Sequence, residues 1–250
     1  MKKIPALVLL LACAHAWGVP AIVQSATGHG TSTTCAVTLN SVAAGDAIIW
    51  HGFAGTASPS FVSIADSSGN TVSAVPGVGW TTNPSPAESF GAYYVQNTSS
   101  GTHTITLTVS ASETSTCAAS EWSGLATSGV ADVASTIKFT ASSSSVSSNS
   151  ITPSANGELV MFLVGQESNL TYSAYNNSFV QQYSSAAMPT VVAASEIQAT
   201  AAAISGAATS SAAASYATVV AAFVPATPPT SVLLENGKVL TESGKVLTEQ

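Results

Sequence analysis

The chain has 250 residues, of which 46% are hydrophobic and 7% are charged, and its formal net charge is −7. It contains no arginine, and Lys138 is the only lysine between Lys3 and Lys238. This shortage of positive charge argues against nucleic-acid binding and against phosphate-bearing cofactors, because both need Lys or Arg at phosphate groups. We therefore expect no cofactor. The neutral polar residues that dominate the remainder favour strands and turns.

Residues 1–16 have the pattern of a secretory signal peptide. Lys2 and Lys3 precede an apolar run over residues 4–12, which is too short to span a bilayer. Ala14-His15-Ala16 fits a cleavage site between small residues. The alternative is a lipoprotein signal with Cys13 as the lipid anchor, although Leu11 fits that motif poorly. We expect a protein that is secreted or held at the cell surface, or on a virion surface if a phage encodes it.

In the first half of the chain, alternating or apolar segments predict strands at residues 21–26, 35–39, 47–53, 61–65, 71–75, 89–96 and 103–109. The polar run from Asp66 to Asn70 contains Gly69 and predicts a hairpin turn. A loop rich in Gly and Pro follows over residues 76–87, with Trp80 in its middle.

In the second half, strands are predicted at residues 133–140, 159–165, 179–183, 190–198 and 216–224. The serine-rich residues 142–150 are expected to form an exposed connection, and residues 166–178 a polar loop. The Ala/Ser/Thr run over residues 199–215 resembles a helix in its alanine content. Its Ser and Thr residues and Gly206 favour paired strands joined near Gly206 instead.

The two halves of the chain echo each other. Residues 45–50 match residues 157–162 in type, residues 94–96 parallel 196–198, and the strand that ends at Trp122 parallels the one that ends at Phe223. Convergent strand patterning would give the same likeness. The many short strands predict an all-β fold over residues 17–225, namely an antiparallel two-sheet β-sandwich that is jelly-roll-like and pseudo-symmetric.

Beyond the sandwich, residues 226–231 are expected to form a stiff Pro-rich linker and residues 232–250 a small separate tail. In this tail, residues 235–241 are repeated as residues 242–248, and each copy contains a turn at Asn236-Gly237 or Ser243-Gly244. The tail therefore predicts a three-stranded β-meander, marginal in isolation, through which copies of the chain could self-associate. It resembles the repetitive Glu-Asn-Gly tails of phage structural proteins.

Cys35 and Cys117 remain after removal of a signal peptide that contains Cys13. Two cysteines in an exported chain suggest one disulfide, and two buried free thiols are the alternative. No metal site is expected, because neither cysteine has a second ligand at a suitable spacing.

No catalytic site is predicted, so the protein is expected not to be an enzyme. His29, His51 and His103 share no metal-ligand spacing, and a structural role is expected for each. A glycoside hydrolase, the less favoured alternative, needs two facing carboxylates, and nothing in the sequence pairs any two of its candidates. These candidates are Glu121, Glu158, Glu167 and Glu196. Calcium binding at Asp66 and Asn70 is not expected, because one hairpin supplies too few oxygens.

Aromatic residues in polar loops are the best candidates for ligand binding. Trp80 lies in the loop over residues 76–87, and Tyr172 and Tyr175 lie beside Asn176 and Asn177. Flat rings next to amides suit neutral sugars, which are bound by stacking and uncharged hydrogen bonds. The alternative is that these rings fold back over the ends of the sandwich.

The run Glu121-Trp122-Ser123-Gly124, followed by a loop to Asp132, carries a family resemblance. With Gly45-Asp46, residues 66–71 and residues 157–160, it resembles a secreted bacterial β-sandwich module in which the run is commonly Glu-Tyr-Ser-Gly. The resemblance implies a non-catalytic module, often attached to surface or polysaccharide-acting proteins. Two functions follow as expectations: recognition of a glycan or cell-surface polymer, or structural assembly in a phage virion or surface layer.

Overall fold

The computed structural model describes residues 19–55, 59–85 and 87–227, and the short tail strands at residues 234–235, 238–239, 241–242 and 245–246. The predicted signal peptide and most of the predicted linker lie outside these residues. Val19–Ala226 form one compact unit. Within the described residues, no helix is long and apolar enough to cross a membrane.

The first half of the compact unit forms one seven-stranded antiparallel sheet in the order β1-β7-β2-β6-β4, with β3 also paired to β7 and β5 to β6. The strands are β1 (Ala21–Val42), β2 (Ala47–Ala54), β3 (Phe61–Asp66), β4 (Ser73–Ala74), β5 (Thr81–Pro84), β6 (Ala87–Val95) and β7 (Gly101–Ser123).

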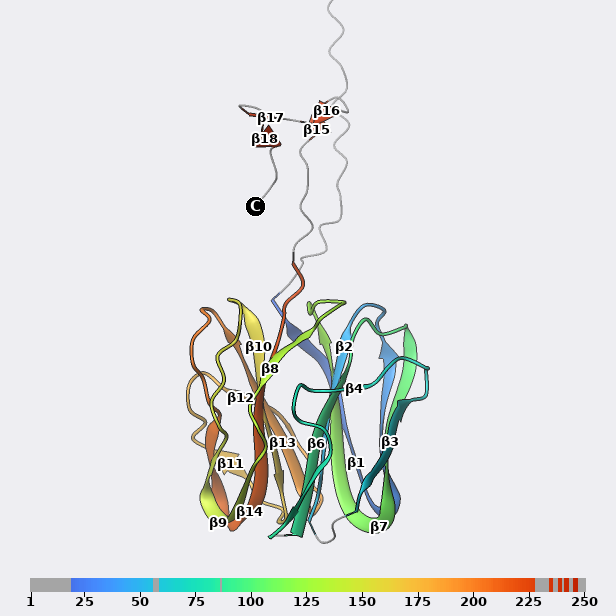
Figure 1. The fold of residues 1–250 in the computed structure, drawn as a ribbon, viewed down its shortest axis with the longest axis vertical. Helices are drawn as coiled ribbons and strands as arrows, with labels where there is room; N and C mark the ends of the chain where they lie inside the picture. The colour runs from blue at the N-terminus through green and yellow to red at the C-terminus, as the bar shows by residue number, and fades with distance from the viewer. Residues whose placement is uncertain are drawn as a thin grey trace, which may run out of the picture. The chain divides into compact units, whose positions relative to one another are not determined.

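The second half forms another seven-stranded antiparallel sheet in the order β11-β14-β10-β13-β12, with β8 and β9 also paired to β14. The strands are β8 (Ala131–Ala134), β9 (Lys138–Ser147), β10 (Glu158–Gln166), β11 (Tyr172–Ser173), β12 (Val180–Ser184), β13 (Thr190–Gln198) and β14 (Ala207–Phe223). Figure 1 shows the two halves side by side, each built from consecutive strands. The predicted all-β, two-sheet antiparallel sandwich is confirmed.

The connectivity agrees with the internal echo in the sequence. In each half, a central strand lies between a long strand and a second inner strand: β2 lies between β7 and β6, and β10 lies between β14 and β13. Ala47 lies opposite Trp122, and Leu159 lies opposite Phe223, so these two pairs are equivalent under the internal match. The third match is shifted by one residue, because Ile48 faces Val95 whereas Val160 faces Glu196.

Three hydrophobic clusters hold this unit together. The central cluster lies between the sheets and contains Ile49, Phe53 and Trp122 from one sheet with Met161 and Val219 from the other. The first-half cluster includes Trp50, Tyr93 and Ile105, and the second-half cluster includes Phe162, Tyr216 and Val220. The inner strands are buried on both faces because each contributes alternate residues to the central cluster and to the cluster of its own half.

The first-half cluster forms because β1 and β7 fold over as a pair. Residues 21–32 of β1 pair with residues 113–123 of β7, and residues 34–42 pair with residues 101–108, with a register shift between Ser32 and Thr34. The two layers meet at the disulfide bond between Cys35 and Cys117. They approach so closely that a Cβ at position 28 would lie 2.0 Å from the carbonyl oxygen of Ala36, so Gly28 is required.

Several segments differ from the sequence-based prediction. β5 and β11 are short strands within segments that were predicted as loops. β1 is continuous through residues 27–34, which were not predicted as a strand. The serine-rich segment predicted as a connection contributes residues 142–147 to β9, which pairs with β14. Residues 199–206 form no strand, and β14 begins after Gly206 and runs on to Phe223. In β1 and β9, backbone pairing with a neighbouring strand organises a polar segment that lacks clear apolar alternation.

The tail contains two hairpins in the described residues. β15 (Leu234–Glu235) pairs with β16 (Lys238–Val239), and β17 (Thr241–Glu242) pairs with β18 (Lys245–Val246). These pairs form two separate two-stranded sheets. The predicted three-stranded meander stays a prediction, because most of the tail lies outside the described residues.

Candidate functional site

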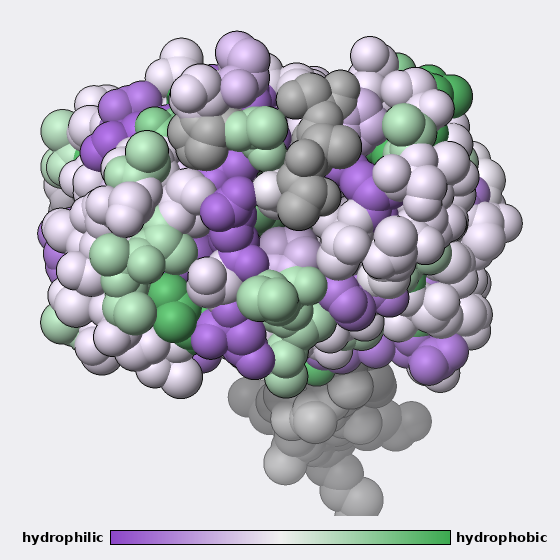
Figure 2. All heavy atoms as spheres, turned by 90° about the horizontal axis from the view of Figure 1, so that it is seen from below, coloured by the Kyte–Doolittle hydropathy of each residue, from purple (hydrophilic) through white to green (hydrophobic). Residues whose placement is uncertain are grey.

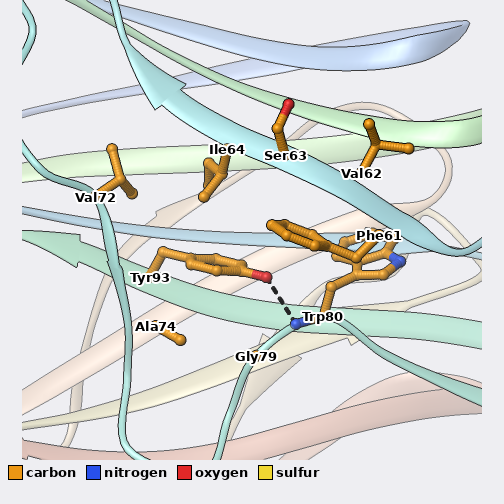
Figure 3. Close-up of a pocket in the computed structure, with 9 residues that line it drawn as sticks. All are labelled: Phe61, Val62, Ser63, Ile64, Val72, Ala74, Gly79, Trp80 and Tyr93. Carbon is orange, nitrogen blue, oxygen red and sulfur yellow. Dashed lines mark hydrogen bonds between the residues drawn. The ribbon is translucent and has the colours of Figure 1, made fainter.

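An open groove of about 610 Å³ lies on the first half of the sandwich. It runs between the side chains of β3 and those of β6 and the preceding loop, as Figure 3 shows. The lining contains no Asp, Glu, His, Lys or Arg side chain, and the phenol of Tyr93 is its one titratable group. The lining residues are Phe61, Val62, Ser63, Ile64, Val72, Ala74, Gly79, Trp80 and Tyr93.

Trp80 is held in this groove by two hydrogen bonds, one from its main chain and one from its indole ring. Its main-chain N–H donates to the Tyr93 hydroxyl at 2.8 Å, and its indole N–H donates to the carbonyl oxygen of Pro59 at 3.3 Å. A Cβ at position 91 would lie 2.9 Å from the Cα of Trp80, so Gly91 gives the loop room to rest directly on β6. The ring is half-buried and packs against the first-half cluster.

Tyr93 and Phe61 complete the aromatic wall of the groove. Their rings are nearly parallel, with centroids 6.0 Å apart and an interplanar angle of 14°. Tyr93 also packs edge-on against the buried Trp50, with centroids 5.7 Å apart. Phe61 and Val62 are exposed to 43% and 56%. The groove therefore offers rings and aliphatic surface to solvent, while the polar atoms of Trp80 already have partners.

The other predicted binding residues lie in the second half, away from Trp80. Tyr172 and Tyr175 pack against the second-half cluster, and their hydroxyls donate to Gln166 and Gln181. Burial raises the pKa of both phenols. The structure thus places the predicted aromatic residues in two separate places.

Asn176 and Asn177 direct their amides at the main chain. Asn176 donates to the carbonyl oxygen of Ser205 at 2.8 Å and accepts from the N–H of Ala207 at 2.6 Å. Asn177 donates to the same carbonyl at 3.0 Å. These contacts fix the loop against the start of β14, so the described amides are engaged within the protein.

The residues that carry the family resemblance have structural contacts. Glu121 is fully buried, and it accepts hydrogen bonds from the N–H of Ala43 at 2.8 Å and from Gln24 at 2.5 Å. Burial raises the pKa of Asp46 to about 6, and the neighbouring Glu121 adds to this shift. Asp132 accepts from the N–H of Ser154 at 2.7 Å. Glu121 on β7 thus contacts β1 and the turn after it, and Asp132 on β8 contacts the loop before β10.

Two histidines have buried structural roles. His103 contacts Asp66 through Nδ1 at 2.8 Å and the carbonyl oxygen of Ser99 through Nε2 at 2.8 Å, which leaves no free ring nitrogen for a substrate. His51 lies between the sheets, and its Nδ1 is 3.3 Å from the Tyr183 hydroxyl. Burial lowers the pKa of His51 to about 3, so the ring is neutral at physiological pH. His29, on β1, lies with Nδ1 2.9 Å from the Thr116 hydroxyl.

Sequence reasoning found Trp80 but missed the rest of the groove. Phe61 and Tyr93 were assigned only to strands, and the signal that could have found them is the adjacent pair Phe61-Val62, where one face of an edge strand must be exposed. Within the described residues, no three His, Cys, Asp or Glu side chains come together as a metal site. The chain matched no protein-family model, no curated protein and no solved structure.

Two buried glutamates should make the protein less stable as the pH rises. Burial raises the pKa of Glu88 to about 7 and that of Glu113 to about 8, both above the ordinary glutamate value of 4.5. A folded pKa above the unfolded value means that this stability is complete below about pH 4.5 and is lost as the pH rises through 7 and 8. His51 has the opposite shift, so its contribution is lost as the pH falls below 6.5.

We therefore expect the free energy of unfolding, measured in urea, to be greatest between about pH 4.5 and 6.5. By pH 9 it should have fallen by roughly a few kcal/mol. Glu113→Gln should flatten the alkaline decline in part. A wild-type curve that is level from pH 5 to pH 9 would contradict the prediction.

Proposed function

We propose that this protein is a secreted, non-catalytic recognition module that binds neutral glycans or another uncharged cell-surface polymer in the Trp80 groove. The observation that carries the proposal is an open groove that combines the rings of Trp80, Phe61 and Tyr93 with a lining free of acids and bases. An ionic ligand would find no opposite charge in this lining. A sugar ring presents C–H faces that stack on aromatic side chains.

A single groove of this kind supports only weak binding. Stacking adds about 0.5–1.5 kcal/mol per ring beyond area burial, so a site with two or three rings binds at about millimolar concentration, near −4 kcal/mol. Attachment to a polymer would then need several copies acting together. Self-association through residues 232–250 would supply this avidity.

Trp80→Ala should abolish glycan binding, because it removes the largest ring of the groove. We expect it to lower the free energy of unfolding by about 1–3 kcal/mol, less than the 3–5 kcal/mol of a fully buried aromatic residue, since Trp80 is half-buried. A glycan array followed by titration calorimetry on the full chain measures the binding, and urea denaturation measures the stability.

Three further variants serve as controls for this prediction. Trp80→Phe should keep the packing and part of the binding, and Phe61→Ala should weaken binding. Tyr175→Ala alters the separate aromatic site in the second half, so it should leave binding unchanged. Loss of binding in Tyr175→Ala with full binding in Trp80→Ala would place the ligand in the second half. Absence of glycan binding by the wild type would reject the proposal.

The alternative function is structural assembly, as in a phage virion or surface layer. The two short strand pairs of the tail favour it, because within the described residues each strand pairs with a single neighbour, so another chain could extend the pair. Removal of residues 230–250 should leave the melting temperature nearly unchanged and reduce self-association in light scattering. A large fall in melting temperature would show instead that the tail stabilises the sandwich.

A further inference from the structure

Three polar side chains from both sheets converge at one end of the central core. Glu88 on β6 alternates with Phe90 and Ala92, which belong to the central cluster, so it points between the sheets. Glu167 lies directly after β10, four residues beyond Leu163, and Ser215 lies two residues before Ala217 on β14. Leu163 and Ala217 belong to the central cluster, so by the same alternation Glu167 and Ser215 also point between the sheets. Figure 2 shows one end of the sandwich, where polar residues gather along the seam between the halves.

Contacts confirm that Glu167 and Ser215 are neighbours, and burial together with the nearby Glu167 raises the pKa of Glu88. The main-chain N–H of Glu167 donates to the carbonyl oxygen of Ser215, and the Ser215 hydroxyl donates to Oε2 of Glu167 at 2.8 Å. A Cβ at position 55 would lie 3.1 Å from Cγ of Glu167. Ala54 pairs with Ser89, so the next residue, Gly55, lies beside Glu88. The close contact with Gly55 therefore places Glu167 near Glu88.

Glu88 is the unusual member of this group. Its exposed fraction is 0%, and neither carboxyl oxygen has a hydrogen-bond partner within the described residues. A buried carboxylate without a partner is costly, and a second carboxylate beside it raises the cost. Such a pair must therefore hold either a proton or a cation.

We propose that Glu88, Glu167 and the Ser215 hydroxyl form a binding site for a divalent hard cation of the Ca²⁺ or Mg²⁺ class, joining the two halves of the sandwich. The two carboxylates offer four oxygens and the hydroxyl a fifth. Hard cations accept carboxylates together with neutral oxygens and waters, so two acidic ligands are enough for a weak site. Glu167 is only half-buried, which leaves a route for the ion from solvent.

Glu113 is the other buried glutamate of the first half whose carboxyl oxygens both lack a partner within the described residues, and its surroundings differ from those of Glu88. It lies on the same side of β7 as Cys117, which faces the first-half cluster. No second carboxyl group acts on it: burial alone raises its pKa. Glu113 is therefore the matched control for Glu88.

The test is thermal unfolding of the full chain at pH 7.5, after treatment with EDTA, with and without calcium chloride at about 10 mM. Weak extracellular calcium sites have a Kd of about 10⁻⁴–10⁻³ M, so saturation should raise the melting temperature of the wild type by about 3–10 °C. Glu113→Gln should show the same rise. Glu88→Gln and Glu167→Gln should show none.

Calorimetric titration of calcium into the wild type provides a readout that does not depend on the variants. One saturable site per chain, lost in Glu88→Gln, supports the proposal. No saturable binding together with an unchanged melting temperature overturns it and assigns a proton to Glu88. An equal calcium-dependent rise in Glu88→Gln and the wild type also overturns it, because the ion would then bind elsewhere. None of these outcomes depends on glycan binding.

Discussion

Removal of the Cys35–Cys117 disulfide is expected to lower the free energy of unfolding by about 4.5 kcal/mol. The bond joins residues separated by 82 positions, so it closes a long loop in the unfolded chain and restricts that ensemble strongly. It also crosses between the two layers of the folded β1–β7 pair, where Gly28 lies against Ala36. Both cysteines are buried, at 5% and 0% exposure, which shields the bond from reductants while the fold is intact.

The measurement compares the oxidised wild type with the double variant Cys35→Ala, Cys117→Ala in urea denaturation. Reductant should destabilise the wild type to near the level of the double variant and leave the double variant unchanged. Intact mass of the unreduced exported protein should show no alkylatable thiol at Cys35 or Cys117. Two alkylatable thiols, or a loss below about 1 kcal/mol, would contradict the expected role of the bond.

The prediction of strands from the sequence succeeded where one face of a strand is apolar or the whole strand is buried. β2 and β10 are strongly apolar and buried along their whole length, and the matched positions Ala47 and Leu159 pair with Trp122 and Phe223. The first part of β7 alternates cleanly, with Ile105 and Leu107 inside. These signals come from burial, which composition and periodicity report directly.

Sequence reasoning failed where backbone pairing alone fixes the structure. Residues 27–34 of β1 and 142–147 of β9 are mostly Ser, Thr and Gly, and they form strands because each pairs with a long neighbouring strand, β7 or β14. No local pattern reports that pairing. The register shifts at Ser32 and near Ala214 can be seen only with the partner strand in place.

The candidate site shows the same division. Trp80 was identifiable because a large ring in a Gly- and Pro-rich loop is unusual. Its neighbours were not, because Phe61 lies on β3 and Tyr93 on β6, and these strands belong to different layers of the first half. Glu88 and Glu167 come from different sheets, so only the tertiary structure brings them together. Tyr172 gave the same loop signal as Trp80, yet it packs against the second-half cluster.

Asp66→Ala is expected to lower the free energy of unfolding by about 3–5 kcal/mol, because it would leave the buried His103 without its carboxylate partner. Both side chains of this pair are fully shielded from solvent. The Asp66 carboxylate and the Ser99 carbonyl oxygen each lie 2.8 Å from one ring nitrogen of His103, so loss of the carboxylate would leave Nδ1 buried without this partner.

The pair ties the turn after β3 to the start of β7. Asp66 also accepts from the N–H of Ser68 at 3.1 Å and from the amide of Asn70 at 2.7 Å, so one carboxylate organises the whole hairpin turn. Asn70→Ala keeps the Asp66–His103 contact and removes the Asn70 amide, which also bonds to Ser99, so it should cost about 1 kcal/mol and serves as the matched control.

A double-mutant cycle of Asp66→Ala and His103→Ala, followed by urea denaturation at pH 6, measures the coupling between the two side chains. We expect the double variant to be less destabilised than the sum of the single variants by about 1–3 kcal/mol, because each single variant leaves a buried polar group unpaired. Additive effects would show that the two side chains act independently. An Asp66→Ala variant that loses no more stability than Asn70→Ala would show that the turn, and not the buried ion pair, accounts for the contribution of Asp66.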